Sequence, residues 1–535
     1  MNTMQAQVQV PLQANTIPEL VFHASRQFAG RPAIEDQDGC IDYGDLADRA
    51  LQVARSLMQL GVQSGDRVAV WAPNSARWIL ATLGLQMAGA VLVPINTRMK
   101  AAEARDIIER SGTRVLFSVG DFLDTDYPAM LAEDCTALLD MTIVMSPRAG
   151  APLVNCLDWD AFLERGGAVC ASAAWARAGA VNADSLSDLM FTSGTTGKPK
   201  GVMGAHGAAI RSFSEFVRIL GLVPGDRFLV VNPFFHAFGY KAGWLSCLLC
   251  GATILPHPVF DADEVLERIE RDRVSVLPGP PTLYLSLLAH PKLSQKDLSS
   301  LRVASTGAST IPPILIERMQ RELGFKVVTT AYGLTECGGL ATICDPADPV
   351  TTIAGTSGRA IPGTEVAILD SGGQRLAAGE NGEICIRGFH VMQGYFQNEA
   401  ATVEAIDSDG WLHTGDIGAL DAKGYLRITG RLKDMFIVGG FNCYPAEIEA
   451  ALLEHPDIAQ TAVIGVPDER MGEVGCAYIV RRQGSELAEK ALIQWSREHM
   501  ANYKVPRLVR FVESLPVNAS NKVDKLALKR DFAGA

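Results

Sequence analysis

The sequence is short of basic residues. Its 48 lysines and arginines are outnumbered by 60 aspartates and glutamates, which gives a formal net charge of −12. Nucleic-acid-binding domains usually carry a basic excess, so this balance argues against a nucleic-acid partner. It does not exclude a small anionic ligand, because a site for one needs only a few local cations.

Long apolar runs are also missing. No stretch of the sequence reaches the roughly 18 uninterrupted apolar residues of a membrane-spanning helix. Residues 1–18 lack the basic start and the apolar stretch of a secretory signal. The sequence therefore predicts a cytoplasmic protein without a transmembrane segment.

The eleven cysteines form no metal-binding pattern. The Cys-x-x-Cys pair of Cys247 and Cys250 lies in an apolar run, and no second Cys/His pair at metal-binding spacing accompanies it. We expect two small side chains on the buried face of one helix. Cysteine usage of this kind is typical of a reducing cytoplasm.

The chain is too long for one ordinary core, because 535 residues favour at least two domains. Strand-like segments alternate with helix-like ones, as in residues 67–72, 75–89 and 90–94, and residues 274–277 repeat the strand pattern. This alternation is typical of a parallel sheet covered by helices.

The pattern changes near residue 355, where the predicted strands become short and are interrupted by Gly and Asp. We predict a small antiparallel barrel or sheet at 355–430. We expect an α/β multidomain fold. A large N-terminal domain of helix-covered mixed sheets, residues 16–431 with the β-rich part included, is expected to precede a small α+β C-terminal domain, residues 432–535.

The most informative segment is a Gly-, Thr- and Lys-rich loop between a predicted strand and a predicted helix at 206–220. Glycines let backbone amides turn toward an anion, while hydroxyls and lysines bind phosphate oxygens. The loop is not a Walker P-loop, because Thr192 stands at the first glycine position and Pro199 follows Lys198. Its predicted nucleotide-binding residues are Thr192, Ser193, Gly194, Thr195, Thr196, Gly197, Lys198 and Lys200.

This loop resembles the nucleotide loop of the adenylate-forming superfamily, which includes acyl-CoA synthetases, firefly luciferases and peptide-synthetase adenylation domains. The resemblance covers residues 20–530, with further motifs in the family's order. The sequence is also similar to bacterial fatty-acid–CoA ligases, including those that activate cyclic propionate side chains in steroid breakdown. The resemblance implies an acid–thiol ligase that uses ATP, Mg²⁺ and coenzyme A.

The resemblance assigns roles to three motifs of the large domain. His236, in the segment 232–240, would lie beside the acyl group and the adenylate phosphate. In the segment 332–336, Thr335 would bind the phosphate and Tyr332 would stack near the adenine. Glu336, with Thr192, would hold Mg²⁺, a hard cation that favours oxygen ligands.

The same resemblance covers the second half of the chain. Asp416 and Arg431 would bind the ribose, and Lys433 would be the pivot of a domain swing. Lys522 would bridge the attacking carboxylate and the α-phosphate. The family usually has Gly before this lysine, whereas this chain has Asn521, the next-best residue for a left-handed backbone.

The predicted catalytic residues are Thr192, His236, Glu336 and Lys522. Outside the loop, the predicted nucleotide- and coenzyme-binding residues are Gly307, Ala308, Ser309, Tyr332, Gly333, Thr335, Asp416, Ile428, Arg431, Lys433, Gly439, Gly440 and Phe441. The predicted acyl pocket is formed by His236, Phe238, Gly239, Tyr240, Trp244, Ala308, Ala331, Gly333, Cys337 and Gly338.

The acid is expected to be apolar and to lack an amino group near its carboxyl. Related amino-acid-activating domains place an Asp near the His236 segment, whereas residues 233–245 contain no acidic residue and five aromatic ones. Fatty, aryl and cyclic acids remain open. Free coenzyme A is the simpler acceptor, because the chain ends thirteen residues after Lys522 without a carrier domain.

Two other functions remain open at this point. The protein could load the phosphopantetheine of a separate carrier, or it could bind an acyl-adenylate without catalysis. Luciferase-type oxidation shares the first half-reaction with the ligase. The oligomeric state is also open, a homodimer included.

Overall fold

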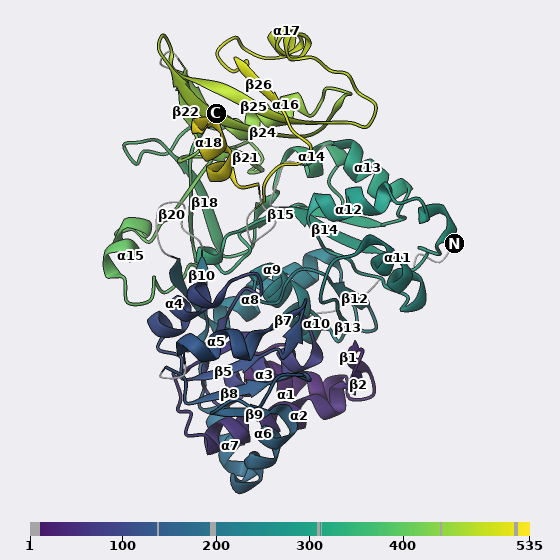
Figure 1. Cartoon of the computed structure of the whole chain (residues 1–535), viewed down its shortest axis with the longest axis vertical. Coiled ribbons are helices and arrows are strands. Elements are labelled where there is room, and N and C mark those ends of the chain that lie inside the picture. The colour runs from purple at the N-terminus through teal and green to yellow at the C-terminus, as the bar shows by residue number, and fades with distance from the viewer. Residues whose placement is uncertain are drawn as a thin grey trace.

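The computed structural model of the chain describes residues 11–135, 138–192, 199–307, 311, 313–438, 441–517 and 523–534, with the backbone alone at 132–135, 441 and 442. The purple and blue N-terminal part lies at one end of the molecule and the yellow C-terminal part at the other (Figure 1). Ser193, Gly194, Thr195, Thr196, Gly197, Lys198, Ala308, Ser309, Gly439, Gly440 and Lys522, all predicted site residues, lie outside the described residues.

A seven-stranded sheet forms the centre of the N-terminal half. All neighbouring strands in it are parallel except β10 and β11 at one edge. In order across the sheet the strands are β11 (Lys200–Ala205), β10 (Leu186–Thr192), β4 (Val91–Pro94), β3 (Arg67–Trp71), β5 (Val115–Ser118), β8 (Met141–Val144) and β9 (Cys156–Asp158). Strands β4 and β5 are buried along their whole length, as helix-covered parallel strands are.

Helices pack around this sheet. They are α1 (Ile17–Gln27), α2 (Tyr43–Gln59), α3 (Ala76–Met87), α4 (Ala101–Ser111), α5 (Tyr127–Cys135), α6 (Trp159–Arg165), η1 (Gly166–Ala168), α7 (Ala171–Gly179) and α8 (His206–Leu220), with a short hairpin of β6 (Asp121–Phe122) and β7 (Thr125–Asp126). The helices predicted at 75–89 and 206–220 are confirmed as α3 and α8. Ser75 caps α3 by accepting a hydrogen bond from the Trp78 amide, and Gly221 ends α8 in the left-handed conformation.

Two four-stranded sheets form the next layer. The first contains β2 (Gly39–Asp42), β1 (Pro32–Asp36), β13 (Thr253–Pro256) and β12 (Arg227–Val230); the second contains β14 (Val303–Gly307), β15 (Val327–Tyr332), β16 (Thr342–Ile343) and β17 (Arg359–Ala360). Val276 joins the two, because it pairs in parallel with Phe228 on one side and Val303 on the other. The strand predicted at 274–277 is therefore reduced to this single bridging position.

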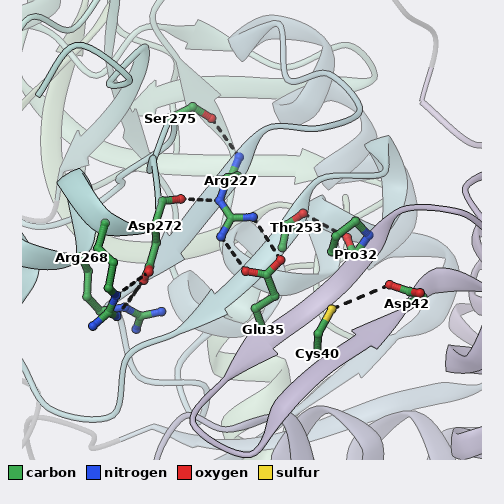
Figure 2. Close-up of polar contacts among 10 residues, drawn as sticks. Pro32, Glu35, Cys40, Asp42, Arg227, Thr253, Arg268, Asp272 and Ser275 are labelled. Carbon is green, nitrogen blue, oxygen red and sulfur yellow. Dashed lines mark hydrogen bonds and ion pairs between the residues drawn. The ribbon is translucent and has the colours of Figure 1, made fainter.

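Figure 2 shows the polar network that joins the N-terminal hairpin of β1 and β2 to β12 and β13 of the same sheet. The guanidinium of Arg227 on β12 donates to both carboxylate oxygens of Glu35 on β1, at 3.1 and 2.5 Å, and its Nε donates to the Asp272 carbonyl. Thr253 on β13 donates to the Pro32 carbonyl at 3.0 Å. Strands distant in sequence are thus fixed side by side.

Short helices surround this second layer. They are α9 (Ala237–Gly239), a π-helical turn η2 (Tyr240–Leu245), α10 (Ser246–Cys250), α11 (Ala262–Arg271), α12 (Pro281–Leu288), η3 (Leu293–Gln295), α13 (Pro313–Arg321), η4 (Thr335–Cys337) and α14 (Val350–Gly355). Cys247 and Cys250 are buried on α10, and their thiols donate to backbone carbonyls. The expectation of two small side chains on a buried helix is therefore confirmed.

The β-rich region is an antiparallel sheet of four consecutive strands, with α15 (Glu399–Ala405) at its side. The strands are β18 (Thr364–Leu369), β19 (Gly382–Gly388), β20 (Leu412–Leu420) and β21 (Leu426–Arg431). Each of these strands pairs with the next one in the chain, from β18 to β21. Of the two predicted alternatives the described strands form the sheet, and closure into a barrel stays a prediction.

The C-terminal part has its own sheet and its own apolar core. The sheet contains β23 (Phe441–Cys443), β22 (Phe436–Val438), β25 (Gly472–Arg481), β24 (Ile458–Asp468) and β26 (Leu508–Phe511), and the helices are α16 (Pro445–Leu452), α17 (Glu489–His499) and α18 (Lys525–Ala533). Phe436, Ile448 and Ile479 are among the side chains of its core. The exact boundary at 431/432 remains a prediction. In the described part of the chain, no helix is long and apolar enough to cross a membrane.

Candidate active site

The candidate site lies where three sheets meet. Thr192 is the last residue of β10 in the seven-stranded sheet, Tyr332 is the last residue of β15, and Asp416 lies on β20 of the antiparallel sheet. Because strand ends present side chains and free backbone groups to solvent, this convergence is typical of ligand sites in α/β proteins. Two groups of polar contacts define the site.

The first group surrounds Glu336. The Thr192 hydroxyl donates to Glu336 Oε1 at 3.3 Å, and the Tyr395 hydroxyl donates to the same oxygen at 3.0 Å. Lys200 Nζ lies 4.8 Å from the centroid of the Tyr395 ring. The structure thus brings together three predicted residues, Thr192, Lys200 and Glu336, and adds a fourth side chain between them.

Tyr395 is a site residue that the sequence analysis missed. It reaches the site because residues 393–396 pair with β11: the Gln393 and Phe396 amides donate to the carbonyls of Met203 and Gly201 at 3.0 and 2.8 Å. Burial and the charge of Glu336 raise the pKa of Tyr395 well above its usual range, so its hydroxyl stays a donor. The sequence signal is weak, since Tyr395 stands in an ordinary Gly-Tyr turn.

The second group surrounds Asp416, which is 6% exposed. The Tyr332 hydroxyl donates to Oδ2 at 2.7 Å, and Arg431 Nε donates to Oδ1 at 2.9 Å. Asp416 and Arg431 face each other across β20 and β21, which fixes their distance. Burial and the neighbouring Asp416 raise the pKa of Tyr332 well above its usual range, so this hydroxyl also stays protonated.

Glycines shape the turn between β15 and η4. A Cβ atom added at Gly333 would lie 2.5 Å from the Gly339 carbonyl carbon, so only glycine lets the two backbones touch. Gly338 has a φ of 70° and closes η4 in the left-handed conformation. The Thr335 and Glu336 side chains are half-buried at the edge of this turn.

The residues of the predicted acyl pocket differ in exposure. His236 is exposed and caps the short helix α9, on which Phe238 is half-buried. Tyr240 and Trp244 are fully buried and stack at 4.9 Å between ring centroids, and Gln86 of α3 donates to the Tyr240 hydroxyl at 2.8 Å. These two aromatic side chains therefore pack toward α3, and their contact with an acyl group stays a prediction.

The remaining pocket positions have small side chains or none. Gly307 and Ala331 pair with each other near the ends of the parallel strands β14 and β15, and both are half-buried. A Cβ atom at Gly239 would lie 2.2 Å from the Pro233 carbonyl oxygen, so Gly239 is needed for close backbone packing. Cys337 is buried, and burial raises the pKa of its thiol to about 12.

The predicted hinge is an exposed turn. Lys433 is exposed, and the amides of Asp434 and Met435 both donate to the Arg431 carbonyl, at 3.1 and 3.0 Å. The Leu432 amide donates to the Gly415 carbonyl at 2.8 Å. Ile428 is 37% exposed on β21, and of Phe441 the structure describes only the backbone, on β23.

Comparison with known families matches this arrangement to one class of enzyme. The family described as AMP-binding enzyme matches residues 21–396, and the AMP-binding enzyme C-terminal domain matches residues 447–522. The chain belongs to the AMP-binding enzyme family, within the adenylate-forming superfamily, and the resemblance seen in the sequence is confirmed.

Two curated relatives are similar over almost the whole chain. Both are called 3-[(3aS,4S,7aS)-7a-methyl-1,5-dioxo-octahydro-1H-inden-4-yl]propanoyl:CoA ligase. The protein from Rhodococcus jostii is 48% identical over 97% of this chain and 99% of its own length. The protein from Mycobacterium tuberculosis is 47% identical over 96% of this chain and 98% of its own length.

A solved structure gives the same result for the fold. ATP-bound MatB from Rhodopseudomonas palustris has a TM-score of 0.84 with this chain and is 28% identical, over 96% of this chain and 99% of the other. The predicted α/β class with a separate C-terminal domain is therefore confirmed.

Proposed function

We propose that this enzyme is an ATP-dependent acyl-CoA ligase. It joins a carboxylic acid to AMP with release of pyrophosphate, and then transfers the acyl group to coenzyme A with release of AMP. The observation that carries the proposal is the identity of 47–48% with two CoA ligases over nearly the full length of each chain. The polar groups around Glu336 and Asp416 supply a site of the required chemistry.

In the first step a carboxylate oxygen of the acid attacks the α-phosphorus of ATP. The new bond joins that oxygen to phosphorus, and the bond from phosphorus to the bridging oxygen of pyrophosphate breaks. The reaction needs positioning and charge neutralisation more than covalent help from the protein. We assign the phosphate contacts to residues 192–200 and Thr335, and the bridging cation to Lys522.

The nucleoside is assigned to the second group of contacts. Asp416 presents carboxylate oxygens that can accept hydrogen bonds from ribose hydroxyls, and Arg431 and Tyr332 hold that carboxylate in place. Tyr332 also presents its ring at the end of β15, beside the proposed adenine position.

The residues around Glu336 suit a magnesium ion. Glu336 has a carboxylate, Thr192 has a hydroxyl 3.3 Å from it, and both are hard oxygen donors of the kind that Mg²⁺ prefers. When bound there, the ion would neutralise charge on the phosphate oxygens. Tyr395 and Lys200 would hold and flank the carboxylate from the side of β11.

In the second step the thiol of coenzyme A attacks the acyl carbon, and the bond from that carbon to AMP breaks. The thiol proton passes to solvent. We assign Lys433 as the pivot that exchanges Lys522 for the thiol channel at Gly439, Gly440 and Phe441. His236, exposed at the N-terminus of α9, is assigned to the acyl side of the adenylate.

We further propose that the acid is a propanoate on a fused, mostly apolar ring system. The names of both curated relatives support this class. Gly307, Ala331 and Gly338 are predicted pocket positions without large side chains, and the predicted pocket residue Phe238 is half-buried. The absence of acidic residues at 233–245 also leaves no partner for the ammonium of an amino acid.

The test is an assay of thioester and AMP formation with a panel of acids. The bicyclic dioxo-propanoate should exceed octanoate, an aryl propenoate and an amino acid by about 100-fold in kcat/KM, as discrimination by pocket shape allows. Formation of ADP in place of AMP would contradict the reaction class. Activity with a carrier-bound phosphopantetheine and none with free coenzyme A would contradict the proposal that coenzyme A is the acyl acceptor.

A further inference from the structure

A histidine lies between two carboxylates next to the proposed ribose contact. His413 on β20 and Glu383 on β19 approach each other across the sheet, with 2.8 Å between His413 Nδ1 and Glu383 Oε2. On the other side of the ring, His413 Nε2 lies 3.4 Å from Asp407 Oδ2. Both ring nitrogens thus face a carboxylate, an arrangement that favours the imidazolium form.

The titratable groups in contact with the ring are acidic or neutral, and Arg387, two residues after Cys385 on β19, forms its ion pair with Glu365. The groups that face it are Glu383 and Cys385 on β19 and Asp407 from the segment before β20. Burial raises the pKa of the Cys385 thiol to about 12, so this thiol is neutral. Asp407 is itself held by the Asp409 and Trp411 amides, each at 2.9 Å.

The same carboxylate that holds His413 also holds the bulged turn of β20, residues 413–415, that leads to Asp416. Glu383 Oε1 accepts a hydrogen bond from the Gly415 amide at 3.0 Å. Thr414 donates to the Ile384 carbonyl at 2.7 Å and accepts from the Asp416 amide at 3.1 Å. Each residue from His413 to Gly415 is therefore attached to β19, directly before the proposed ribose ligand.

We propose that Glu383, His413 and Asp407 are positioning residues that hold the turn 413–415, and with it the Asp416 carboxylate, in the geometry that accepts the ribose hydroxyls. The contacts of His413 with Glu383 and Asp407 are strongest while His413 is protonated, because charge-assisted hydrogen bonds are stronger than neutral ones. The inference rests on the proposed function, since it assumes that Asp416 binds the ribose.

The sign of the pH dependence follows from the direction of the pKa shift. Partial burial lowers the pKa of His413, but the hydrogen bonds and charges of Glu383 and Asp407 outweigh burial and raise it above its usual value of 6.5. A raised histidine pKa means that the contribution is fully present below the ordinary pKa and is lost as the pH rises through the folded value. Ribose recognition should therefore weaken with rising pH.

The test measures the ribose contribution alone. Dissociation constants of AMP and of 2′,3′-dideoxy-AMP are measured by calorimetry with the full-length protein at about pH 6 and about pH 9, on either side of the histidine titration. The quantity compared is the dissociation constant of 2′,3′-dideoxy-AMP divided by that of AMP, in which titration of the phosphate cancels. In the unmodified protein this ratio should fall about fivefold at the higher pH, the size of one modest hydrogen bond.

Variants separate positioning from general structure. In His413→Asn and Glu383→Gln the ratio should be low at both pH values. Glu365→Gln is the matched control, because Glu365 forms an exposed ion pair with Arg387 in the same sheet, and its ratio should follow the unmodified protein. Thermal unfolding of each variant shows that it is folded at both pH values.

Four results would overturn the inference. A ratio that does not change with pH in the unmodified protein, or a pH effect that persists in His413→Asn, contradicts it while the ligase activity in the acid panel is unaffected. An unchanged ratio in Glu383→Gln contradicts the attachment through Gly415. Failure of AMP to bind at all would overturn the proposed function together with this inference.

Discussion

Asp188 on β10 and Lys241 on η2 form a buried ion pair. The Nζ and Oδ1 atoms lie 3.1 Å apart, and only 3% and 2% of the two side chains are exposed. Asp188 is four residues before Thr192 on β10, and Lys241 is five residues after His236. The pair therefore joins the strand that leads into the nucleotide loop to the segment that carries the proposed acyl-side histidine.

Replacement of Lys241 by Met should destabilise the protein by about 3–5 kcal/mol, because the Asp188 carboxylate would remain buried without its partner. Unfolding in denaturant measures the loss. Lys292→Met is the matched control: Lys292 is half-exposed in an ion pair with Asp263, and its loss should cost less than about 1 kcal/mol. Equal losses in the two variants would contradict a special role of the buried pair.

Tyr395 gives a second test at the residue scale. Tyr395→Phe removes the hydrogen bond to Glu336 and should slow acid-dependent pyrophosphate exchange about tenfold, the effect of one hydrogen bond to a charged group. Thioester formation from supplied acyl-AMP should change far less. Tyr425→Phe, which removes a hydroxyl bonded to Asp348 away from the site, is the control. Equal slowing of both half-reactions by Tyr395→Phe would argue against its assigned place.

Single residues also show the limit of sequence reasoning. Asp416, Arg431 and Tyr332 were predicted as neighbours of the nucleoside, and the structure brings the three together by hydrogen bonds. Tyr395 could not be predicted, because its place depends on the pairing of residues 393–396 with β11, about 190 positions earlier in the chain. Tyr240 is fully buried and bonded to Gln86, and its place in the acyl pocket stays a prediction, because an aromatic residue of a core and one of a pocket look alike in sequence.

At the scale of elements, periodicity was most reliable for long segments. The helix predicted at 206–220 matches α8, because its apolar positions follow the helical period and Gly221 stops it. Residues 274–277 read as a strand but form only single bridges at Val276, because that segment fills the space between β12 and β14. Partners across a sheet are set by tertiary packing, which one strand's composition does not record.

The turn at Lys433 is the element on which the second half-reaction should depend. Lys433→Pro fixes φ near −65° and should slow thioester formation from supplied acyl-AMP about tenfold or more, while pyrophosphate exchange changes little. Lys433→Ala removes the charge but keeps the backbone freedom, so it separates the two causes. Parity of the half-reactions in the proline variant would contradict a pivot at this position.

At the scale of the whole molecule, the site depends on the meeting of three separately built sheets. Thr192 comes from the seven-stranded sheet, Glu336 follows β15 of the second layer, and Asp416 comes from the antiparallel sheet, while Lys522 is assigned to the C-terminal part. The C-terminal part also contacts this region at Gly430, where an added Cβ atom would lie 3.2 Å from Tyr444. Motif order predicts such a meeting, but only the fold supplies its distances.

The central claim is that the acid's own oxygen becomes bonded to the phosphorus of AMP. The most direct measurement uses the bicyclic propanoate labelled with ¹⁸O in its carboxyl group, together with ATP and coenzyme A, and determines by mass spectrometry where the label appears. The account predicts one ¹⁸O atom in the AMP that is released with each acyl-CoA. Thioester formation with unlabelled AMP, or with the label in inorganic phosphate beside ADP, would contradict it.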